Sequence, residues 1–95
     1  MNILSILNTI LFMHNMFMEK FSNEKFGERL RLVRNMRGYT LQNMADSLYI
    51  GLRSYQNYEA GDRFPSPTVL RAIAQKLNVS IDYLLWLTDE EPVDE

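Results

Sequence analysis

The 95-residue sequence has no cysteine and a single histidine, His14. The missing thiols exclude disulfide bonds, thiolate catalysis and every cysteine-based zinc or iron–sulfur site, and they suit a reducing compartment such as the cytoplasm. One imidazole leaves no histidine pair for a metal site and no histidine-dependent catalytic triad with a spare member. Carboxylates do not cluster at a useful spacing either. We therefore expect a protein that is not an enzyme, with no catalytic residue, no metal and no cofactor.

Glycine and proline are scarce, with four and three residues, whereas hydrophobic residues make up 46% of the chain. This composition is too apolar for a chain that is disordered throughout, and the length suits one domain with a modest core. The sequence shows no alternation of apolar and polar residues typical of strands, no internal repeat and no low-complexity tract. It therefore predicts an all-α fold.

Positive charge is in slight deficit, because ten basic residues face twelve acidic ones and the formal net charge is −2. Taken alone, this value argues against a strongly basic nucleic-acid-binding protein. The total hides a gradient along the chain. Residues 20–63 have eight basic and five acidic side chains (net +3), and residues 64–95 have two basic and six acidic ones (net −4). The basic middle is therefore the part to consider for nucleic acid, and the acidic end is interpreted as a solvated tail.

Apolar residues recur at helical spacing in six segments, and most of these begin at a residue that caps helix N-termini. The predicted helices are residues 3–21, 23–36, 41–48, 52–60, 67–77 and 81–87. The predicted N-caps are Asn23, Thr40, Gly51, Ser66 and Ser80. Gly38 and Gly61 are expected to end helices in the left-handed conformation. We divide the chain into an apolar N-terminal extension (1–22), a five-helix domain (23–88) and an acidic tail (89–95).

The predicted core comes from the inward faces of these helices. Its members are expected to be Phe26, Leu30, Val33 and Met36, then Leu41, Met44, Ala45 and Leu48, and finally Val69, Leu70, Ile73, Ala74 and Leu77.

The N-terminal extension has one charge in residues 1–19, Glu19, and an apolar stripe that includes Ile3, Ile6 and Ile10. Polar interruptions argue against a membrane span, and the missing basic residues argue against a secretory signal. Three interpretations stay open for residues 1–17. They are an upstream extension from a misplaced start codon, a helix that packs on the domain or forms a dimer, or a surface-membrane anchor. The last is disfavoured because the polar face has no basic residue.

Two short predicted helices, 41–48 and 52–60, are joined by a three-residue turn, with the small Ala45 where they must cross closely. This arrangement is typical of a helix-turn-helix. The run TLQNMADSLYIGLRSYQNYEAGDRFPS (residues 40–66) resembles the Cro/phage-repressor (XRE-type) DNA-binding family without a gap. The resemblance extends from Glu28 to Asp89. The matching features are Arg34, the Thr40/Ala45/Leu48 pattern, Tyr58-Glu59 with Gly61, Pro65-Ser66 and the run LNVSIDYLL.

The resemblance implies that residues 52–60 form the recognition helix, which enters the major groove of DNA. The implied base-contacting residues are Leu52, Arg53, Gln56 and Asn57. The paired donor and acceptor of an amide suit adenine, and arginine suits guanine or a phosphate. The implied backbone-contacting residues are Thr40, Gln42 and Arg63.

Other residues of the motif are expected to be structural. Arg34 and Glu59 resemble the family's internal ion pair, which ties the first helix of the domain to the recognition helix, and Tyr55 should face the core. Arg29, Arg31 and Arg37 are predicted to lie on solvated helix faces, with Arg37 the best placed of them for a peripheral phosphate.

The chain departs from the family pattern in the turn. Tyr49 stands where glycine is usual, and a positive φ there would strain the backbone by about 1 kcal/mol. Gly51 replaces the usual serine or threonine at the start of the recognition helix, so the capping hydroxyl is lost. Leu52 replaces a polar contact and suits a thymine methyl group instead.

These features predict a sequence-specific, dimeric transcriptional regulator, a repressor of bacterial or prophage type that binds a palindromic operator in double-stranded DNA. The alternative is an antitoxin-like protein-interaction module of the same fold. Two surfaces are candidates for the dimer: the N-terminal helix and the region of Leu85, Trp86 and Leu87. Trp86 itself has two open interpretations, an exposed self-association residue or one that closes the bottom of the core.

Overall fold

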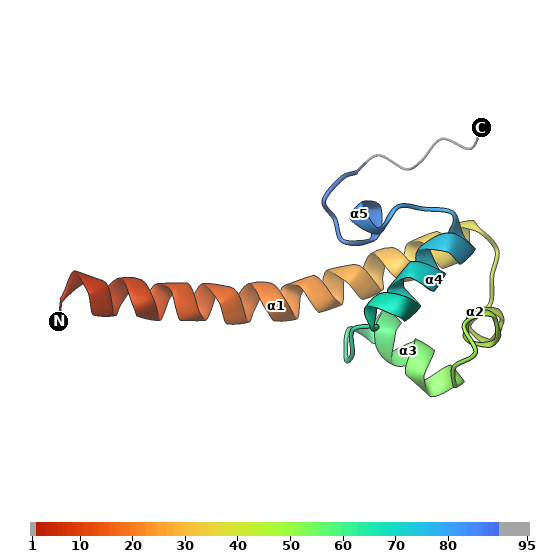
Figure 1. Ribbon diagram of the computed structural model, residues 1–95, viewed down its shortest axis with the longest axis horizontal. Coiled ribbons are helices and arrows are strands. Elements are labelled where there is room, and N and C mark those ends of the chain that lie inside the picture. Colours follow the sequence, from red (N-terminus) through yellow and green to blue (C-terminus); the bar gives the residue numbers. More distant parts are fainter. Residues whose placement is uncertain (1, 90–95) are drawn as a thin grey trace.

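The computed structural model describes residues 2–89, apart from the side chains of residues 15–22, and every regular element in that range is a helix (Figure 1). The elements are α1 (Ile3–Met36), α2 (Leu41–Ser47), α3 (Leu52–Ala60), α4 (Pro67–Leu77) and α5 (Ile81–Leu84). The predicted all-α fold is confirmed. Of the predicted acidic tail, 89–95, all but Asp89 lies outside the described residues.

Helix α1 is one continuous helix of 34 residues, so the predicted helix end near residue 21 and the predicted N-cap at Asn23 are wrong. The N-cap is Asn2, whose side-chain oxygen accepts the Ser5 backbone N–H at 2.8 Å. No glycine or proline interrupts residues 3–26. Asparagine favours a helix start only where the preceding chain is not helical, and here good helix formers precede it.

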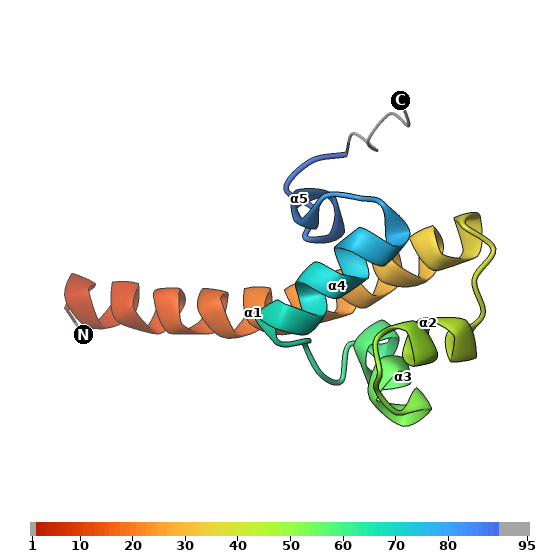
Figure 2. The same ribbon diagram turned by 45° about the vertical axis from the view of Figure 1, so that its right-hand side comes forward.

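The first half of α1 extends away from a body formed by its second half and the other four helices (Figures 1 and 2). In that body α1 packs chiefly on α3, and α2 packs on α3. The largest side chains that are fully buried there are Tyr55, Phe26, Leu30, Met44, Ile73, Leu77, Leu84 and Val33. Each contributes about 1.5–3 kcal/mol of hydrophobic stabilisation.

The predicted core is confirmed except at its edges. Leu41, Val69 and Leu70 are only partly buried and pack against the core from outside. Met36 is 52% exposed, so its predicted inward position is wrong. A three-residue step from Val33 turns the side chain by about 60° around the helix, which carries Met36 past the buried face.

The predicted caps place the short helices correctly. The hydroxyl groups of Thr40, Ser66 and Ser80 accept backbone N–H groups at the starts of α2, α4 and α5. Gly38 and Gly61 have φ values of 76° and 80°, the left-handed conformation in which glycine pays no steric penalty.

Two arginines predicted to be solvated instead donate hydrogen bonds to backbone carbonyls at or just beyond the C-terminal ends of other helices. Arg29 is 6% exposed and donates through Nη1 to the carbonyl oxygens of Tyr83 (2.9 Å) and Thr88 (3.0 Å). Arg37 donates through Nε to the Leu77 carbonyl at 2.9 Å. Carbonyls at helix C-termini have no partner within the helix and carry partial negative charge, so they attract these cations.

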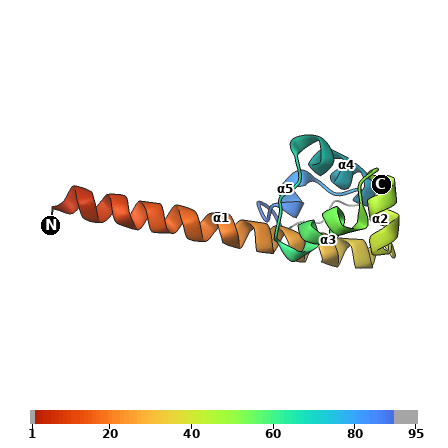
Figure 3. The ribbon, with the colours of Figure 1, turned by 90° about the horizontal axis from the view of Figure 1, so that it is seen from below.

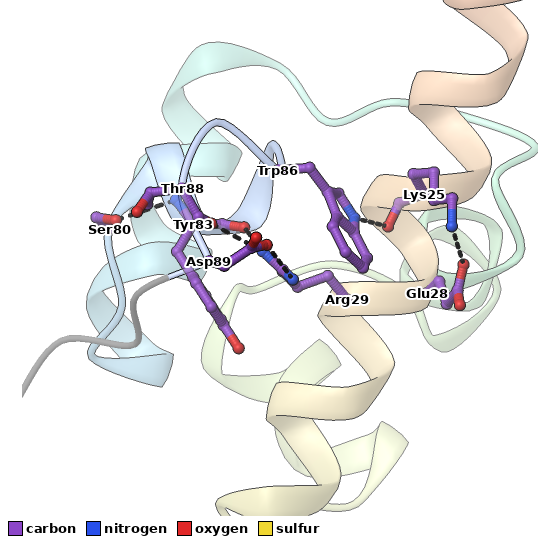
Figure 4. Close-up of polar contacts among 8 residues, drawn as sticks. All are labelled: Lys25, Glu28, Arg29, Ser80, Tyr83, Trp86, Thr88 and Asp89. Carbon is purple, nitrogen blue, oxygen red and sulfur yellow. Dashed lines mark hydrogen bonds and ion pairs between the residues drawn. The ribbon is translucent and has the colours of Figure 1, made fainter.

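Trp86 packs on Arg29 (Figure 4). The Arg29 Cζ atom lies 3.5 Å from the centroid of the Trp86 ring, and the indole Nε1 donates to the Lys25 carbonyl at 2.7 Å. The chain reaches this position through a left-handed residue at Trp86, with φ 63°. Helix α5 therefore ends at Leu84 and does not continue to Leu87 as predicted. Trp86 stays 39% exposed while it closes the contact between α5 and α1.

Within the described residues, we find no helix with the length and apolar character needed to cross a membrane.

Helix α1 approaches α3 closely at Gly27, a residue that the sequence pattern does not mark. A Cβ atom on Gly27 would lie 2.7 Å from the Tyr58 carbonyl oxygen and closer still to that of Glu59. Real Cβ atoms do not come so near to backbone atoms. Only glycine therefore lets the two helices meet at this depth.

We expect the substitution Gly27→Ala to lower the free energy of unfolding by about 1–3 kcal/mol, because the added methyl group pushes α1 away from α3. Helix propensity alone predicts the opposite sign, a gain of roughly 1 kcal/mol. Urea unfolding followed by circular dichroism measures the difference. Ser54→Ala is the control, since it changes an exposed side chain of α3 away from the contact with α1. A Gly27→Ala variant as stable as the native chain would contradict the close approach.

Candidate nucleic-acid interface

Helix α2 begins with a reciprocal cap. The Thr40 hydroxyl oxygen accepts the Asn43 backbone N–H at 2.9 Å, and the Asn43 side-chain oxygen accepts the Thr40 backbone N–H at 3.0 Å. Such a capping box fixes the direction in which the chain enters the helix. Thr40 itself is exposed, so the start of α2 faces solvent.

The turn between α2 and α3 is held by backbone hydrogen bonds. The Ile50 N–H donates to the Ala45 carbonyl at 3.1 Å, and the Tyr49 N–H donates to the Asp46 carbonyl at the same distance. Tyr49 has φ 56° and is 96% exposed. The turn thus keeps the left-handed geometry in spite of its tyrosine, and the ring projects into solvent.

Helix α3 starts at Leu52 and ends at Ala60, as predicted, with Gly51 as an N-cap that makes no side-chain hydrogen bond. Its inner face holds Tyr55, which is 0% exposed. Leu52, Arg53 and Gln56 are exposed, and Leu52 and Gln56 are one turn apart. This helix therefore offers solvent a short row of one apolar, one cationic and one amide side chain.

A bidentate ion pair fixes α3 to α1. The Arg34 Nε atom lies 2.6 Å from Glu59 Oε2, and Nη2 lies 3.1 Å from Oε1. The third donor, Nη1, bonds to the Tyr39 carbonyl at 2.9 Å, before the start of α2. Both side chains are nearly buried, at 10% and 7% exposure. The hydrogen bond to Glu59 raises the pKa of Arg34 above its ordinary value, so the guanidinium group stays charged.

Tyr55 is buried next to this pair. Burial, with a smaller effect from the Glu59 carboxylate, raises the pKa of the Tyr55 phenol well above its ordinary value. The ring therefore stays neutral in the core, and Tyr55 and Glu59 hold α3 from its inner side.

The sequence-predicted site residues differ in their exposure and in their hydrogen bonds. Thr40, Leu52, Arg53, Gln56 and Arg63 are exposed. Gln42 is exposed as well, yet its amide nitrogen donates to Asp46 Oδ1 at 2.8 Å. Asn57 is half-buried, and its backbone carbonyl oxygen accepts the backbone N–H groups of Asp62 and Arg63.

Arg31 is a further residue beside this surface that the sequence analysis did not assign to it. It lines a groove between α1, α2 and α3 together with Gln56 and Leu41. The feature of the sequence that could have identified Arg31 is its position three residues before Arg34, because residues three apart share a helix face.

A family model described as a helix-turn-helix domain matches residues 27–90. The chain belongs to this helix-turn-helix family. The match begins at the glycine where α1 meets α3, so the extended first half of α1 lies outside it.

The chain is similar to several transcriptional regulators. It is 45% identical over 68 residues to the HTH-type transcriptional regulator YqaE of Bacillus subtilis, over 72% of this chain and 59% of that protein. It is 43% identical over 68 residues to the cryptic phage CTXphi transcriptional repressor RstR of Vibrio cholerae, over 70% and 61%. It is 43% identical over 60 residues to the SPbeta prophage-derived HTH-type transcriptional regulator YonR of Bacillus subtilis, over 63% and 56%. The chain thus spans 56–61% of the lengths of these relatives.

We expect Arg34→Ala to destabilise the helix-turn-helix domain by about 3–5 kcal/mol, because the Glu59 carboxylate stays buried without its cation. Thermal unfolding measures the effect. The control is Arg31→Ala, an exposed arginine on the same helix, which should change stability by less than about 0.5 kcal/mol. Equal melting temperatures for the two variants would show that the ion pair does not hold the domain together.

We expect Tyr49→Gly to stabilise the domain by about 1 kcal/mol, because glycine adopts positive φ without the steric penalty. Tyr49→Ala keeps the strained backbone and removes a ring that is almost fully exposed, so it should match the native chain. Chemical unfolding of the three proteins separates the backbone effect from the loss of the ring. A glycine variant no more stable than the alanine variant contradicts the strain.

Proposed function

We propose that the protein is a sequence-specific DNA-binding transcriptional regulator, a cytoplasmic repressor of bacterial or prophage type that binds a palindromic operator as a homodimer. The observation that carries the proposal is the way in which α3 is held in the domain. Tyr55 and Glu59 fix the helix to the domain, and Leu52, Arg53 and Gln56 remain exposed to solvent. A rigid helix with an exposed polar row is what major-groove reading requires. Relatives named as regulators and as a phage repressor support the same function.

Each exposed side chain of α3 suits one feature of a base pair. The Gln56 amide presents a donor and an acceptor that match adenine, and the Asn57 amide is the second candidate of this kind. The Arg53 guanidinium suits the two acceptors of guanine or a phosphate, and Leu52 suits the methyl group of thymine. These residues would therefore supply sequence preference.

Thr40, Gln42 and Arg63 would position the domain on the DNA backbone, without sequence information. Gln42 reaches a phosphate only if its amide leaves Asp46, which is 2.8 Å away, so its contribution should be smaller than that of Arg63. Few cations are left for non-specific contacts, because Arg29, Arg34 and Arg37 are bonded inside the domain. Base contacts and pairing of two domains on a two-fold operator would then provide the affinity. The proposal assigns no catalytic role and needs no metal or cofactor.

In-vitro selection of bound DNA followed by binding titrations tests this assignment. We expect Gln56→Ala to weaken operator binding by about 1–3 kcal/mol and to relax the preference at one base position. Arg63→Ala should weaken binding to all sequences alike and reduce the salt dependence by about one counterion. Gln75→Ala is the control, because it removes an exposed amide on α4, outside this surface.

If the selected sequences are unchanged in both Gln56→Ala and Asn57→Ala, α3 is not the recognition helix. Weak binding that is insensitive to salt and selects no sequence would favour the protein-interaction module instead.

A further inference from the structure

The first part of α1 exposes a large apolar surface. We name residues 3–14 the arm. Its large apolar side chains are Ile3, Leu4, Ile6, Leu7, Ile10, Leu11, Phe12 and Met13, and each is 41–72% exposed. The largest apolar patch on a typical monomeric protein covers roughly 300–600 Å² and is itself often functional. Eight such side chains within about three turns of one helix indicate a surface that another molecule covers.

The arm cannot bury this surface against its own domain. Ile3 and Leu30 are separated by about 7.5 turns of 3.6 residues, so their side chains leave α1 on opposite sides. Ile6 and Val33 have the same separation. Leu30 and Val33 are fully buried in the core, and α1 runs without a break from the arm into the domain (Figure 3). The side of the arm that carries Ile3 and Ile6 therefore points away from the side on which the domain lies.

We propose that a second copy of this chain covers the arm, and that two arms pair side by side in parallel. Ile3, Ile6, Ile10 and Met13 follow one another at steps of three, four and three residues. This spacing alternates like the a and d positions of a heptad and makes a continuous seam for pairing with another helix.

The charge of the arm favours a copy of itself as the partner. Residues 2–14 contain no Asp, Glu, Lys or Arg, so symmetric pairing brings no like charges together. The same absence disfavours polyanionic partners, because an arm that binds DNA phosphates or an anionic lipid surface needs basic residues. Ile3, Ile6, Ile10 and Met13 are 41–72% exposed, so pairing along this side would remove apolar surface that now meets solvent.

The parallel orientation rests on the proposed function. Parallel arms place both helix-turn-helix domains at the same end of the pair, where their recognition helices can reach adjacent half-sites. Because the buried face of α1 is opposite the seam, the domains would lie on the two outer sides of the paired helices. Antiparallel arms would put the domains at opposite ends.

The test compares two variants of the full chain with the same added charge. Ile6→Glu with Ile10→Glu puts four carboxylates into the seam of the pair, and we expect the dissociation constant of the dimer to rise by roughly a hundredfold or more. The control is Ser5→Glu with Asn8→Glu, which places the same charges on the polar side of the arm. Sedimentation velocity without DNA should give a dimer for the native chain and the control and a monomer for the seam variant. Equal thermal stability of the domain in all three shows that it stays folded.

Orientation is tested with Ile3→Cys, since the chain has no other cysteine. Parallel arms bring the two thiols together, and mild oxidation should give a cross-linked dimer. A dimer that does not cross-link overturns the parallel arrangement.

Two further outcomes are decisive. A seam variant that stays dimeric overturns the arm as the interface, as does a monomeric native chain that sediments with phosphatidylcholine–phosphatidylglycerol vesicles. A native chain that dimerises through the arm but selects no DNA sequence overturns the proposed function and leaves the pairing intact.

Discussion

The contact between α1 and α3 is the interaction on which the rest of the molecule depends. Gly27 lets the two backbones meet, and the Arg34–Glu59 ion pair locks them at the distance that this approach sets. The same arginine bonds to the Tyr39 carbonyl and so fixes the chain just before α2. One guanidinium group therefore orients both helices of the helix-turn-helix. The outer face of α3 can stay exposed because its inner face is held so firmly.

Three of the arginines, Arg29, Arg34 and Arg37, bond to groups within the domain. Arg29 bonds to one carbonyl in α5 and one after it and stacks on Trp86 (Figure 4), and Arg37 bonds to the end of α4. Together with Arg34, they use charge from the basic middle of the chain to join α1 to four other parts of the domain. The net +3 of residues 20–63 therefore overstates the charge that DNA would meet. Because few cations remain to meet DNA, pairing of domains and direct base contacts would matter more for affinity than non-specific electrostatic attraction.

The long first helix carries apolar side chains on different faces in its two halves. Over its second half the buried face carries Phe26, Leu30 and Val33, which build the core, and over its first half the other face carries the apolar seam. Because the helix is continuous, the direction of the seam is set by the packing of the domain some seven turns away. Any pairing through the arm is thereby coupled to the position of α3, which is held to the same helix.

The sequence determined the local structure of this protein. Thr40, Ser66 and Ser80 start helices at their own positions, Gly38 and Gly61 end them, and α3 has the predicted limits, because caps and left-handed glycines act through neighbouring residues. The family pattern also named Arg34 and Glu59 as partners, and the structure brings them together. Only the tertiary structure decided where each helix face points. It joined the predicted break at Asn23 into one helix, exposed Met36, and gave Arg29, Arg37 and Trp86 partners 40 to 61 residues away. Helical periodicity shows that a face is polar or apolar, but the distant group that meets it depends on how the helices pack.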